Sequence, residues 1–424
     1  MGFISVFEHE AIKVGEHGFS ESHLQALERF IGNNDETTFP YYSLIHNGVK
    51  FRQYVGVLCV DNITIEVLPK TDRDNCGKDY WRDKLIFMLS KVYRLDVKTP
   101  STVNQRTVSD SPVLDVFIKC FLDEVDKLVN CGLVKCYHKD EDNQKALRGK
   151  LLINKQIQSN FVHKERFFVR YTTYDYEHVV NRIIRQTLGA VIRTSHNTYL
   201  RYRATSILFN FPEVKDIVVT QELFENLYFD RKTDDYKTAI RIAQLLLLHY
   251  APAHVGGSDN YLALMFDMNK LWEEFIYCTL RKKLSDYEVS SQVVKRYWHF
   301  DETNVYKTIR PDIVITKKGK MVEAVLDTKW KCPDKTPSDG DLHQMFVYSQ
   351  MFNTRKVALL YPSYNENSLR LPAHFTNNSD SNCDMLFLGL SQNNNGWCEQ
   401  LTKNVCEWLN PSNHGANQKK SPNL

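Results

Sequence analysis

The chain has 424 residues, 42% of them apolar and 25% charged, with a formal net charge of +3. These values are ordinary for a folded protein of two or three domains, which can bury its cores without disulfides or structural metals. The ten cysteines form no CxxC pair, which argues against a zinc site and favours a reducing compartment. The N-terminus lacks a signal-peptide pattern, and the most apolar window, Ile240–Tyr250, is too short to span a bilayer. We therefore expect a cytoplasmic protein without membrane contact.

The first region, residues 1–144, is predicted to begin with β-strands and to end with helices. Val55–Val60 and Ile63–Leu68 are β-branched runs separated by Asp61-Asn62, which is typical of a hairpin turn. Apolar residues then recur at three- and four-residue spacing, which predicts helices. These helices are Tyr80–Tyr93 and Val113–Leu128.

The middle region, residues 145–252, is predicted to be mainly helical, with helices at Val179–Ile192 and Thr238–Tyr250. From Lys145 to Arg203 there are 12 Lys and Arg residues against three acidic residues, a local charge of about +9. Such a surface can replace counterions along a phosphate backbone. It can equally meet an acidic partner, consist of solvated helix faces or, at Arg148, tie parts of the chain together. The DNA-binding candidates are Arg148, Lys150, Arg182 and Arg185.

The last domain, residues 253–409, is predicted to start at the breaker cluster 253–260, and residues 410–424 form a predicted disordered tail. Its central feature is the stretch Thr308–Trp330, which reads as two strands joined by a turn at Lys318-Gly319. Residues facing each other then have numbers summing to 637. This pairing sets Asp312 opposite Val325.

On that hairpin, Asp327 is a diagonal neighbour of Asp312, within about 7–8 Å, and Lys329 follows on the same face because side chains alternate. Two nearby carboxylates suit Mg²⁺, which prefers oxygen ligands and retains waters. The ion polarises a scissile phosphate, and an adjacent lysine offsets the charge that builds on it. Pro-Asp, spacer, Asp-x-Lys is the pattern of the PD-(D/E)xK nuclease fold. The alternative is purely structural: Asp312 caps a strand, and Asp327 forms a surface ion pair with Lys329.

Neighbouring elements favour the nuclease interpretation. The predicted helix Met268–Leu280 carries Glu273 beside its apolar stripe, where it can point inward, whereas Glu274 is exposed. A second helix, starting at Asp339 as an acidic N-cap, places Gln344, Tyr348 and Met351 on one face. A buried strand follows at Lys356–Pro362, and Tyr287–Tyr297 supplies the strand still missing from an αβββαβ core. The predicted class is therefore a multi-domain α/β protein with a β-rich N-terminal region, a helical middle and a C-terminal nuclease domain built on a mixed sheet flanked by helices.

The sequence also resembles the McrC family, the nuclease subunits of McrBC-type systems that restrict DNA containing modified cytosine. The resemblance rests on Val55-Gly-Val with Ile65-Glu-Val-Leu-Pro-Lys70, on Leu147-Arg-Gly-Lys-Leu151, and on Tyr174-Asp175 followed by Asn181-Arg-Ile-Ile184. It implies that Asp312, Asp327 and Lys329 are catalytic. Glu273 and Gln344 match accessory positions, and the implied Mg²⁺ ligands are Asp312, Asp327 and Glu273.

The resemblance further implies a partner, an McrB-like AAA+ GTPase hexamer that binds and hydrolyses GTP and reads modified cytosine in double-stranded DNA. This chain has no G-x-x-x-x-G-K-[ST] loop, so we expect GTP to be bound by the partner. The expected function is a Mg²⁺-dependent DNA endonuclease subunit that stimulates the GTPase. Two alternatives remain open: a non-catalytic adaptor that activates the GTPase, and a freestanding PD-(D/E)xK nuclease.

Overall fold

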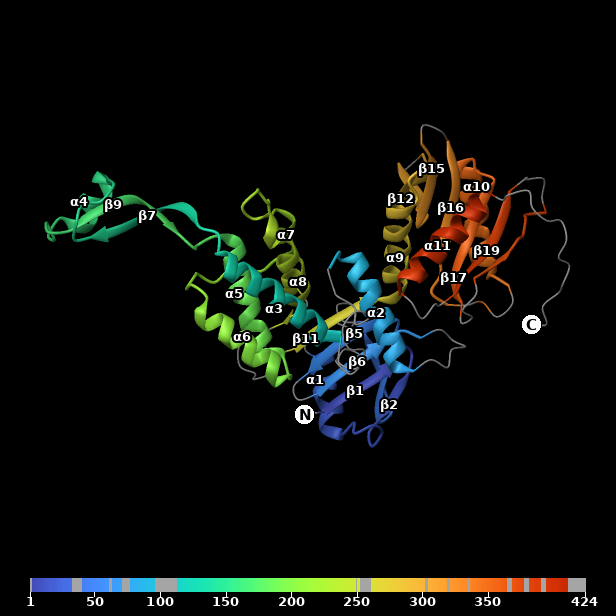
Figure 1. Cartoon of the computed structure of the whole chain (residues 1–424), viewed down its shortest axis with the longest axis horizontal. Coiled ribbons are helices and arrows are strands. Elements are labelled where there is room, and N and C mark those ends of the chain that lie inside the picture. Colours follow the sequence, from blue (N-terminus) through green and yellow to red (C-terminus); the bar gives the residue numbers. More distant parts are fainter. Residues whose placement is uncertain are drawn as a thin grey trace. The chain divides into compact units, whose positions relative to one another are not determined.

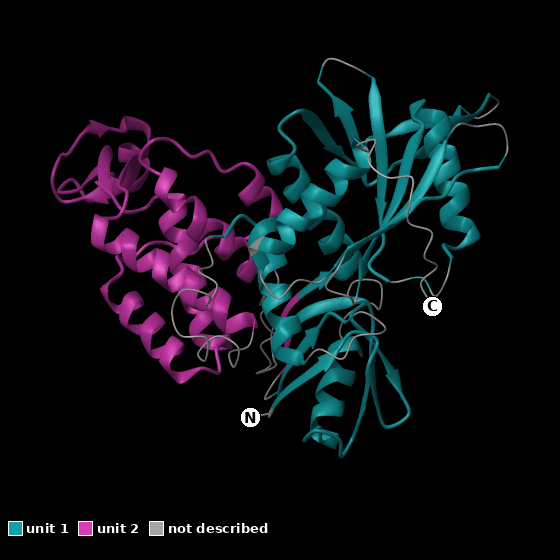
Figure 2. Cartoon of the chain, turned by 45° about the vertical axis from the view of Figure 1, so that its right-hand side comes forward, with its two compact units in different colours: residues 1–57, 62–110, 265–424 teal, residues 58–61, 111–264 magenta. Residues whose placement is uncertain are grey.

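A computed structural model of the chain divides into two compact units (Figure 2). Unit 1 comprises residues 1–57, 62–110 and 265–424, and unit 2 comprises residues 58–61 and 111–264. This division differs from the predicted boundaries after residues 144 and 252, because both ends of the chain contribute to unit 1. The structure describes residues 2–32, 40–60, 63–70, 77–95, 113–248, 250–251, 261–301, 304–318, 321–331, 333, 336–363, 368–376, 381–389 and 394–410.

The N-terminal part of the chain contains two sheets (Figure 1). The larger has the order β1-β6-β5-β11-β10, with β1 parallel to β6, and the smaller has the order β2-β4-β3. Both predicted strands are confirmed as β5 and β6, and they lie inside the sheet with their side chains buried almost throughout. The predicted turn at Asp61-Asn62 lies outside the described residues. The elements are β1 (Gly2–Phe7), β2 (Ala11–Lys13), α1 (Glu21–Gly32), β3 (Tyr42–Ile45), β4 (Gly48–Phe51), β5 (Tyr54–Val60), β6 (Ile63–Leu68), α2 (Lys78–Val92), β10 (Tyr250–Ala251) and β11 (Tyr261–Asp267).

The C-terminal part of unit 1 is a six-stranded mixed sheet with the order β12-β15-β16-β17-β19-β18. The predicted helix–strand order is present, and β12 supplies the missing strand. The expected single strand Tyr287–Tyr297 is wrong in its second half, because the chain leaves this sheet after Ser291 and enters a separate two-stranded ribbon. The elements are α9 (Met268–Lys283), β12 (Tyr287–Ser291), β13 (Lys295–Phe300), β14 (Val305–Ile309), β15 (Ile313–Lys317), β16 (Val322–Thr328), α10 (Asp339–Phe352), β17 (Lys356–Ser363), β18 (Leu369–Leu371), β19 (Asn382–Gly389) and α11 (Asn394–Leu409).

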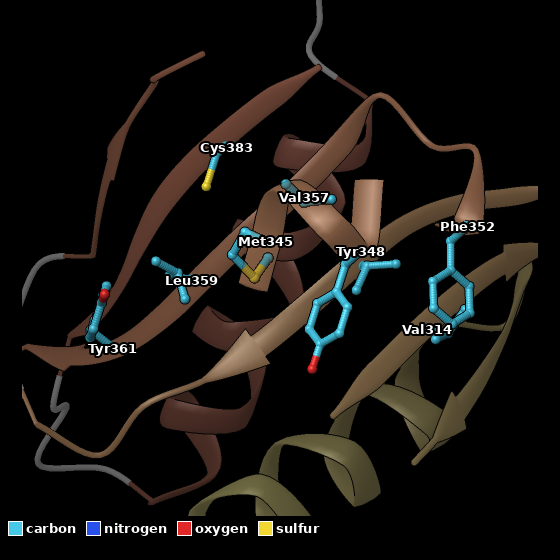
Figure 3. Packing of buried hydrophobic residues seen from close by; sticks show 9 residues of the cluster. Val314, Met345, Tyr348, Phe352, Val357, Leu359, Tyr361 and Cys383 are labelled. Atoms are coloured by element: carbon cyan, nitrogen blue, oxygen red, sulfur yellow. The ribbon is translucent and has the colours of Figure 1, made fainter. Parts of the chain in front are cut away.

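Helices cover both faces of this sheet. α10 packs on β16 and β17 and buries Met345, Tyr348 and Phe352 against strand residues such as Val325 and Val357 (Figure 3). α9 packs on β12 and β16 and contacts α11, which lies on β19. The middle strands are therefore buried on both sides, so a polar site has room only where the strands end.

An aromatic cluster joins the two ends of the chain within unit 1. We call it the tryptophan junction: Trp81 of α2, Trp272 of α9, Trp330 after β16 and Trp397 of α11. The ring centroid of Trp330 lies 6.0 Å from that of Trp81 and 5.2 Å from that of Trp272. Trp330 Nε1 also donates a 2.7 Å hydrogen bond to Glu8 Oε1. The junction explains why residues 1–57 and 62–110 fall in the same compact unit as residues 265–424.

Unit 2 contains a cluster of helices and a β-rich arm. Helices α3, α5, α6 and α8 pack on one another around buried residues such as Ile184 and Leu188. The predicted ranges of α3, α5 and α8 are largely confirmed, although Tyr250 belongs to β10 rather than to the last helix, and α6 was not predicted. The elements are α3 (Val113–Cys131), β7 (Cys136–Gln144), β8 (Lys150–Leu151), α4 (Ile153–Asn160), β9 (Phe167–Asp175), α5 (Val179–Thr194), α6 (Thr198–Asn210), α7 (Gln221–Glu225), the 3₁₀ helix η2 (Asp234–Tyr236) and α8 (Lys237–Leu248).

The middle region is mainly helical, as predicted, but it also contributes to a β-rich arm, formed by β7, β8, α4 and β9, that the sequence did not predict (Figure 1). β7 and β9 pair antiparallel over their whole length, from Cys136↔Asp175 to Gln144↔Phe167. β7 reads CYHKDEDNQ and is largely exposed, so it lacks the apolar alternation by which a strand is recognised.

In the described part of the chain, no helix combines the length and apolar character needed to cross a membrane. The predicted breaker cluster 253–260 and all but the first residue of the predicted tail lie outside the described residues.

Candidate active site

Asp312 stands at a break between two strands. Proline cannot donate a ladder hydrogen bond, and the chain leaves the ribbon at Arg310-Pro311 before it enters β15. β15 and β16 pair antiparallel, with Ile313 opposite Leu326. Paired numbers sum to 639, so the predicted sum of 637 is wrong by two residues. Continued by one residue, this register sets Asp312 directly opposite Asp327.

The error has a physical cause in the connection between the strands. The register shifts after Ile315, and the last pair of the ladder is Thr316 with Val322. The connection is therefore longer than the predicted two-residue turn, of which Gly319 lies outside the described residues. Because side chains alternate with period two, a shift of two residues leaves both carboxylates on the same face. The predicted convergence survives the wrong register.

Asp312 and Asp327 form a buried acidic pair. Asp312 Oδ2 accepts hydrogen bonds from Thr328 N at 2.7 Å and from Thr328 Oγ1 at 2.9 Å. Asp327 is 1% exposed, and its Oδ2 lies 2.7 Å from Lys329 Nζ. Burial raises the pKa of both carboxyl groups, and the charge of Asp312 raises that of Asp327 further.

Lys329 lies between two carboxylates. Its Nζ is 2.7 Å from Asp327 Oδ2 and 3.2 Å from Asp341 Oδ1, on the first turn of α10. Burial opposes its charged form, but the charges of Asp327 and Asp341 outweigh burial and raise the pKa of Lys329. Lys329 is therefore an ammonium ion at neutral pH. The predicted N-cap of α10 is corrected, because Ser338 rather than Asp339 accepts from the helix backbone.

Glu273 faces the acidic pair from α9, as predicted, and its neighbour Glu274 is exposed. α9 starts at the N-cap Asp267, whose carboxylate accepts from two backbone amides of the first turn. Burial raises the pKa of Glu273 to about 7, and the negative charges of Asp312 and Asp327 add to the effect. The three carboxyl groups therefore interact electrostatically.

Gln292 completes this side of the site. It adopts a positive φ of 56° between β12 and β13, and its Nε2 donates to Glu273 Oε1. Its buried Oε1 meets no hydrogen-bond donor among the described residues. A buried acceptor without a donor is costly unless a water or a cation meets it.

We call the cluster of Glu273, Asp312, Asp327 and Lys329 the acidic centre. Gln344 lies on the face of α10 that borders this centre. Its Nε2 donates a 2.6 Å hydrogen bond to Tyr348 Oη. Burial raises the pKa of Tyr348 to about 12, and the charges of Asp327 and Asp312 contribute. The structure thus brings together all five predicted catalytic residues, which come from α9, α10, the segment before β15 and the end of β16. They are Glu273, Asp312, Asp327, Lys329 and Gln344.

The four predicted DNA-binding residues all belong to unit 2. Arg148 and Lys150 are exposed on the arm, where the Arg148 guanidinium lies over the Tyr171 ring at 4.6 Å. Arg182 Nε donates to the Lys215 carbonyl at 2.9 Å, and Arg185 bonds the Val214 carbonyl at 3.4 Å. Arg182 and Arg185 hold the loop at residues 214–216 through these hydrogen bonds, and their role in DNA binding stays a prediction.

Three contacting residues were not identified from the sequence: Gln292, Thr328 and Asp341. Gln292 lies in an unremarkable Ser-Ser-Gln stretch, and no spacing relates it to Glu273. Thr328 stands between the two motif residues Asp327 and Lys329, but the motif leaves that position open. Only Asp341 had a signal, because it is one of two acidic residues at the start of a predicted helix.

The donor set of the centre fits a magnesium ion. No group of three or more His, Cys, Asp or Glu side chains forms a ready-made metal cage in the described ranges. Mg²⁺ does not require one, since it is usually held by one or two carboxylates and keeps several waters. Asp312 and Asp327 supply the carboxylates, with Glu273 beside them, and the orphaned oxygen of Gln292 can accept from a metal-bound water.

Comparisons with known proteins show the family and the fold of the chain. A family model described as the McrBC 5-methylcytosine restriction system component matches residues 49–362. A chain of the half-complex from the tetradecameric assembly of Thermococcus gammatolerans McrB AAA+ hexamers with bound McrC has 20% identity and a TM-score of 0.72, and the alignment covers 96% of this chain and 99% of that one. A chain of the Thermococcus gammatolerans McrBC complex has 23% identity and a TM-score of 0.49, with coverage of 68% and 89%. No curated protein matches the sequence.

The first structural match shows a shared fold over almost the whole chain. The family match extends from β4 to β17 and so includes Asp312, Asp327 and Lys329. As the McrC-like motifs predicted, the chain belongs to the McrBC family of 5-methylcytosine restriction system components.

Proposed function

We propose that this chain is the Mg²⁺-dependent DNA endonuclease subunit of a GTP-dependent restriction complex that acts on modified DNA. The observation that carries the proposal is the convergence of Asp312, Asp327 and Lys329 at the strand ends, with Glu273 facing them from α9. The proposed PD-(D/E)xK domain corresponds to the predicted region 253–409. It begins with α9 and contains the mixed sheet with its flanking helices.

The side chains have distinct roles in the proposed hydrolysis. A bound Mg²⁺ would polarise the scissile phosphate and acidify a water. Asp312 and Asp327 would hold the ion, and Thr328 fixes one Asp312 oxygen by two hydrogen bonds. Lys329 stays protonated between Asp327 and Asp341, so it suits charge neutralisation at the phosphate rather than proton removal.

Glu273 is the group best matched to accept a proton. Its pKa of about 7 lies near the operating pH, which favours a general base. Gln292 orients the carboxylate through its Nε2 donor. Gln344, anchored to Tyr348, would bind a metal-bound water or a phosphate oxygen beside the centre.

We propose an McrB-like AAA+ GTPase hexamer as the partner. The supporting observation is the structural neighbour, which comes from McrB AAA+ hexamers with bound McrC. GTP would be bound by that partner, because this sequence contains no P-loop motif. The partner would read modified cytosine in double-stranded DNA, and both proteins would act in the cytoplasm.

Plasmid cleavage tests the proposal. Methylated and unmethylated plasmids are incubated with Mg²⁺, GTP and the neighbouring AAA+ protein, with wild-type chain or with Asp327→Ala. We expect cleavage of methylated plasmid by the wild type only. Cleavage without the partner would indicate a freestanding nuclease. Stimulated GTP hydrolysis without any cleavage would indicate the adaptor and contradict the proposed nuclease.

A further inference from the structure

The ribbon formed by β13 and β14 has no apolar core of its own. Its strands pair antiparallel from Lys295↔Ile309 to Phe300↔Val305, with an irregularity at Tyr297. Trp298 is 47% exposed and Phe300 40% exposed. An isolated two-stranded ribbon is only marginally stable in water. Exposed aromatic residues on it therefore indicate a surface that a partner covers.

The start of β13 and the end of β14, which we call the roots of the ribbon, both lie next to the acidic centre. β13 begins three residues after Gln292, which donates to Glu273, and β14 ends three residues before Asp312. Gln292 N also donates to the Asp312 carbonyl at 3.1 Å, which ties the two roots together. Whatever binds along the ribbon is therefore directed towards the carboxylates.

The base of the ribbon is anchored to α10. Lys295 Nζ donates to the Met351 carbonyl at 2.9 Å and lies 4.3 Å from the centre of the Phe352 ring. Ile309, opposite Lys295, packs on the core of the sheet. The ribbon is thus fixed at its base and free along its length.

The two faces of the ribbon present aromatic and cationic groups. On one face the rings of Trp298 and Phe300 lie parallel, at 5.9 Å and 8°, and Lys307 pairs with Trp298. On the other face the Arg296 guanidinium lies 4.0 Å from the centre of the Tyr306 ring. In a groove of duplex DNA, such rings can make apolar contacts with base edges and thymine methyl groups, while the cations contact phosphates.

We propose that the β13–β14 ribbon contacts duplex DNA and guides its backbone to the acidic centre. The proposal rests on the proposed nuclease function and adds the element that binds the substrate. A two-stranded ribbon fits the major groove of DNA. The cations Lys295, Arg296, Lys307 and Arg310 lie along the strands and at the root, whereas the acidic Asp301 lies at the turn.

This distribution of charge suits the DNA backbone and disfavours a second copy of the chain as the occupant. Phosphates that contact Lys307 and Arg310 would be drawn towards Asp312, where the metal offsets the repulsion between carboxylates and phosphate. A second copy would instead set the same cations against each other. If the ribbon variants lost a dimer without losing DNA affinity, the ribbon would join two copies of the chain, and the DNA proposal would be contradicted.

The test measures DNA affinity rather than cleavage. The full-length chain carrying Lys329→Ala, which is expected to cleave slowly and to keep its Mg²⁺ affinity, is titrated into a fluorescein-labelled duplex with Mg²⁺ at several salt concentrations, and anisotropy reports binding. We expect Trp298→Ala with Phe300→Ala to weaken binding at least about tenfold, because two large aromatic side chains are lost from the interface. Lys307→Ala should lower the slope of log K against log salt by about 1.

Matched variants control for unspecific effects. Phe3→Ala removes an aromatic side chain that is also 47% exposed, and Lys403→Ala removes an exposed cation of α11. Both should leave affinity and salt slope unchanged. Since the substituted ribbon residues are exposed, their removal should leave thermal unfolding unaltered.

Three results would overturn the ribbon proposal. The first is equal affinity of the ribbon variants and their parent, the second is absence of duplex binding by the parent, and the third is loss of a dimer in sedimentation with unchanged DNA affinity. Failure of the proposed nuclease function has a different signature. It appears as absent plasmid cleavage by the wild-type chain with its partner, whatever the anisotropy shows.

Discussion

At the scale of single residues, an excess of negative charge decides the properties of the centre. Lys329 contacts Asp327 and Asp341, and Asp312 and Glu273 add two further carboxyl groups near Asp327. Burial raises the pKa of Glu273, Asp312 and Asp327, and repulsion from neighbouring carboxylates raises that of Glu273 and Asp327 further. A divalent cation removes this repulsion, so metal binding and the titration of these groups are linked.

The raised pKa of Glu273 predicts a pH-dependent gain in stability on its removal. Between about pH 4.3, where an unfolded glutamate titrates, and pH 7, the folded state holds the proton that the unfolded state has released. The free energy of unfolding therefore falls as pH rises through this window. Glu273→Gln removes the cost, so it should raise metal-free stability more at pH 8 than at pH 5.

Urea unfolding in EDTA at both pH values measures this difference. Glu288→Gln, an exposed carboxylate of β12, serves as the control and should show no comparable change between pH 5 and pH 8. The same effect of Glu273→Gln at both pH values would show that Glu273 does not carry the raised pKa.

Lys329 gives a kinetic prediction. Lys329→Ala removes the cation that would offset charge at the phosphate, and we expect cleavage to slow by about 10²–10³-fold. Mg²⁺ affinity should be unchanged or higher, because Asp327 loses a competing cation. The measurement is single-turnover cleavage over a range of Mg²⁺ concentrations, with Lys331→Ala as an exposed control. Unchanged cleavage by Lys329→Ala would refute the assigned role.

At the scale of elements, the sequence specified faces better than registers. The alternation around Asp312 and Asp327 placed both carboxylates on one face, and period two made that result insensitive to a two-residue shift. The register itself depends on the connection after Ile315, where no Gly pair or Pro marks the irregularity. Contacts such as Gln292 with Glu273 depend on tertiary packing, which local periodicity does not encode.

The strands of the arm were not predicted from the sequence, and the reason differs between β7 and β9. β7 is stabilised by pairing with β9 and by polar side chains, so its sequence carries little apolar pattern. β9, with the sequence FFVRYTTYD, is rich in aromatic and β-branched residues and had a recognisable strand signal. The prediction for residues 145–252 used the helical periodicity and the basic charge, and it missed this strand.

The tryptophan junction predicts a coupling between elements far apart in the sequence. Trp330→Phe removes the donor to Glu8 but keeps a ring, and Glu8→Ala removes the acceptor. In a double-mutant cycle we expect a coupling of about 1.5–3 kcal/mol in the free energy of unfolding, since hydrogen bonds to charged groups contribute this much. Trp330→Phe combined with Glu28→Ala on α1 should be additive. A coupling near zero with Glu8→Ala would show that the bond does not stabilise the junction.

At the scale of the whole molecule, both ends of the chain build unit 1, so the nuclease region is not expected to be self-sufficient. The segment 261–410 expressed alone would expose Trp272, Phe275 and Trp397, which lie beside α2 in the complete chain. We expect this fragment to aggregate or to lose its near-ultraviolet circular dichroism, because a large apolar surface would meet water. Cooperative unfolding of the fragment with the stability of the full chain would contradict the unit division.

Mn²⁺ binding is the most direct test of the central claim, that one divalent ion is shared by the carboxylates of unit 1. Electron paramagnetic resonance of free Mn²⁺ during titration reports the bound fraction for wild type, Asp312→Asn and Asp327→Asn, with the exposed Asp286→Asn as control. We predict that both centre variants weaken binding by at least about tenfold, in line with the loss of a direct carboxylate ligand, and that Asp286→Asn binds as the wild type does. Equal Mn²⁺ binding by all four chains would show that Asp312 and Asp327 hold no metal. That result would contradict the proposed nuclease centre.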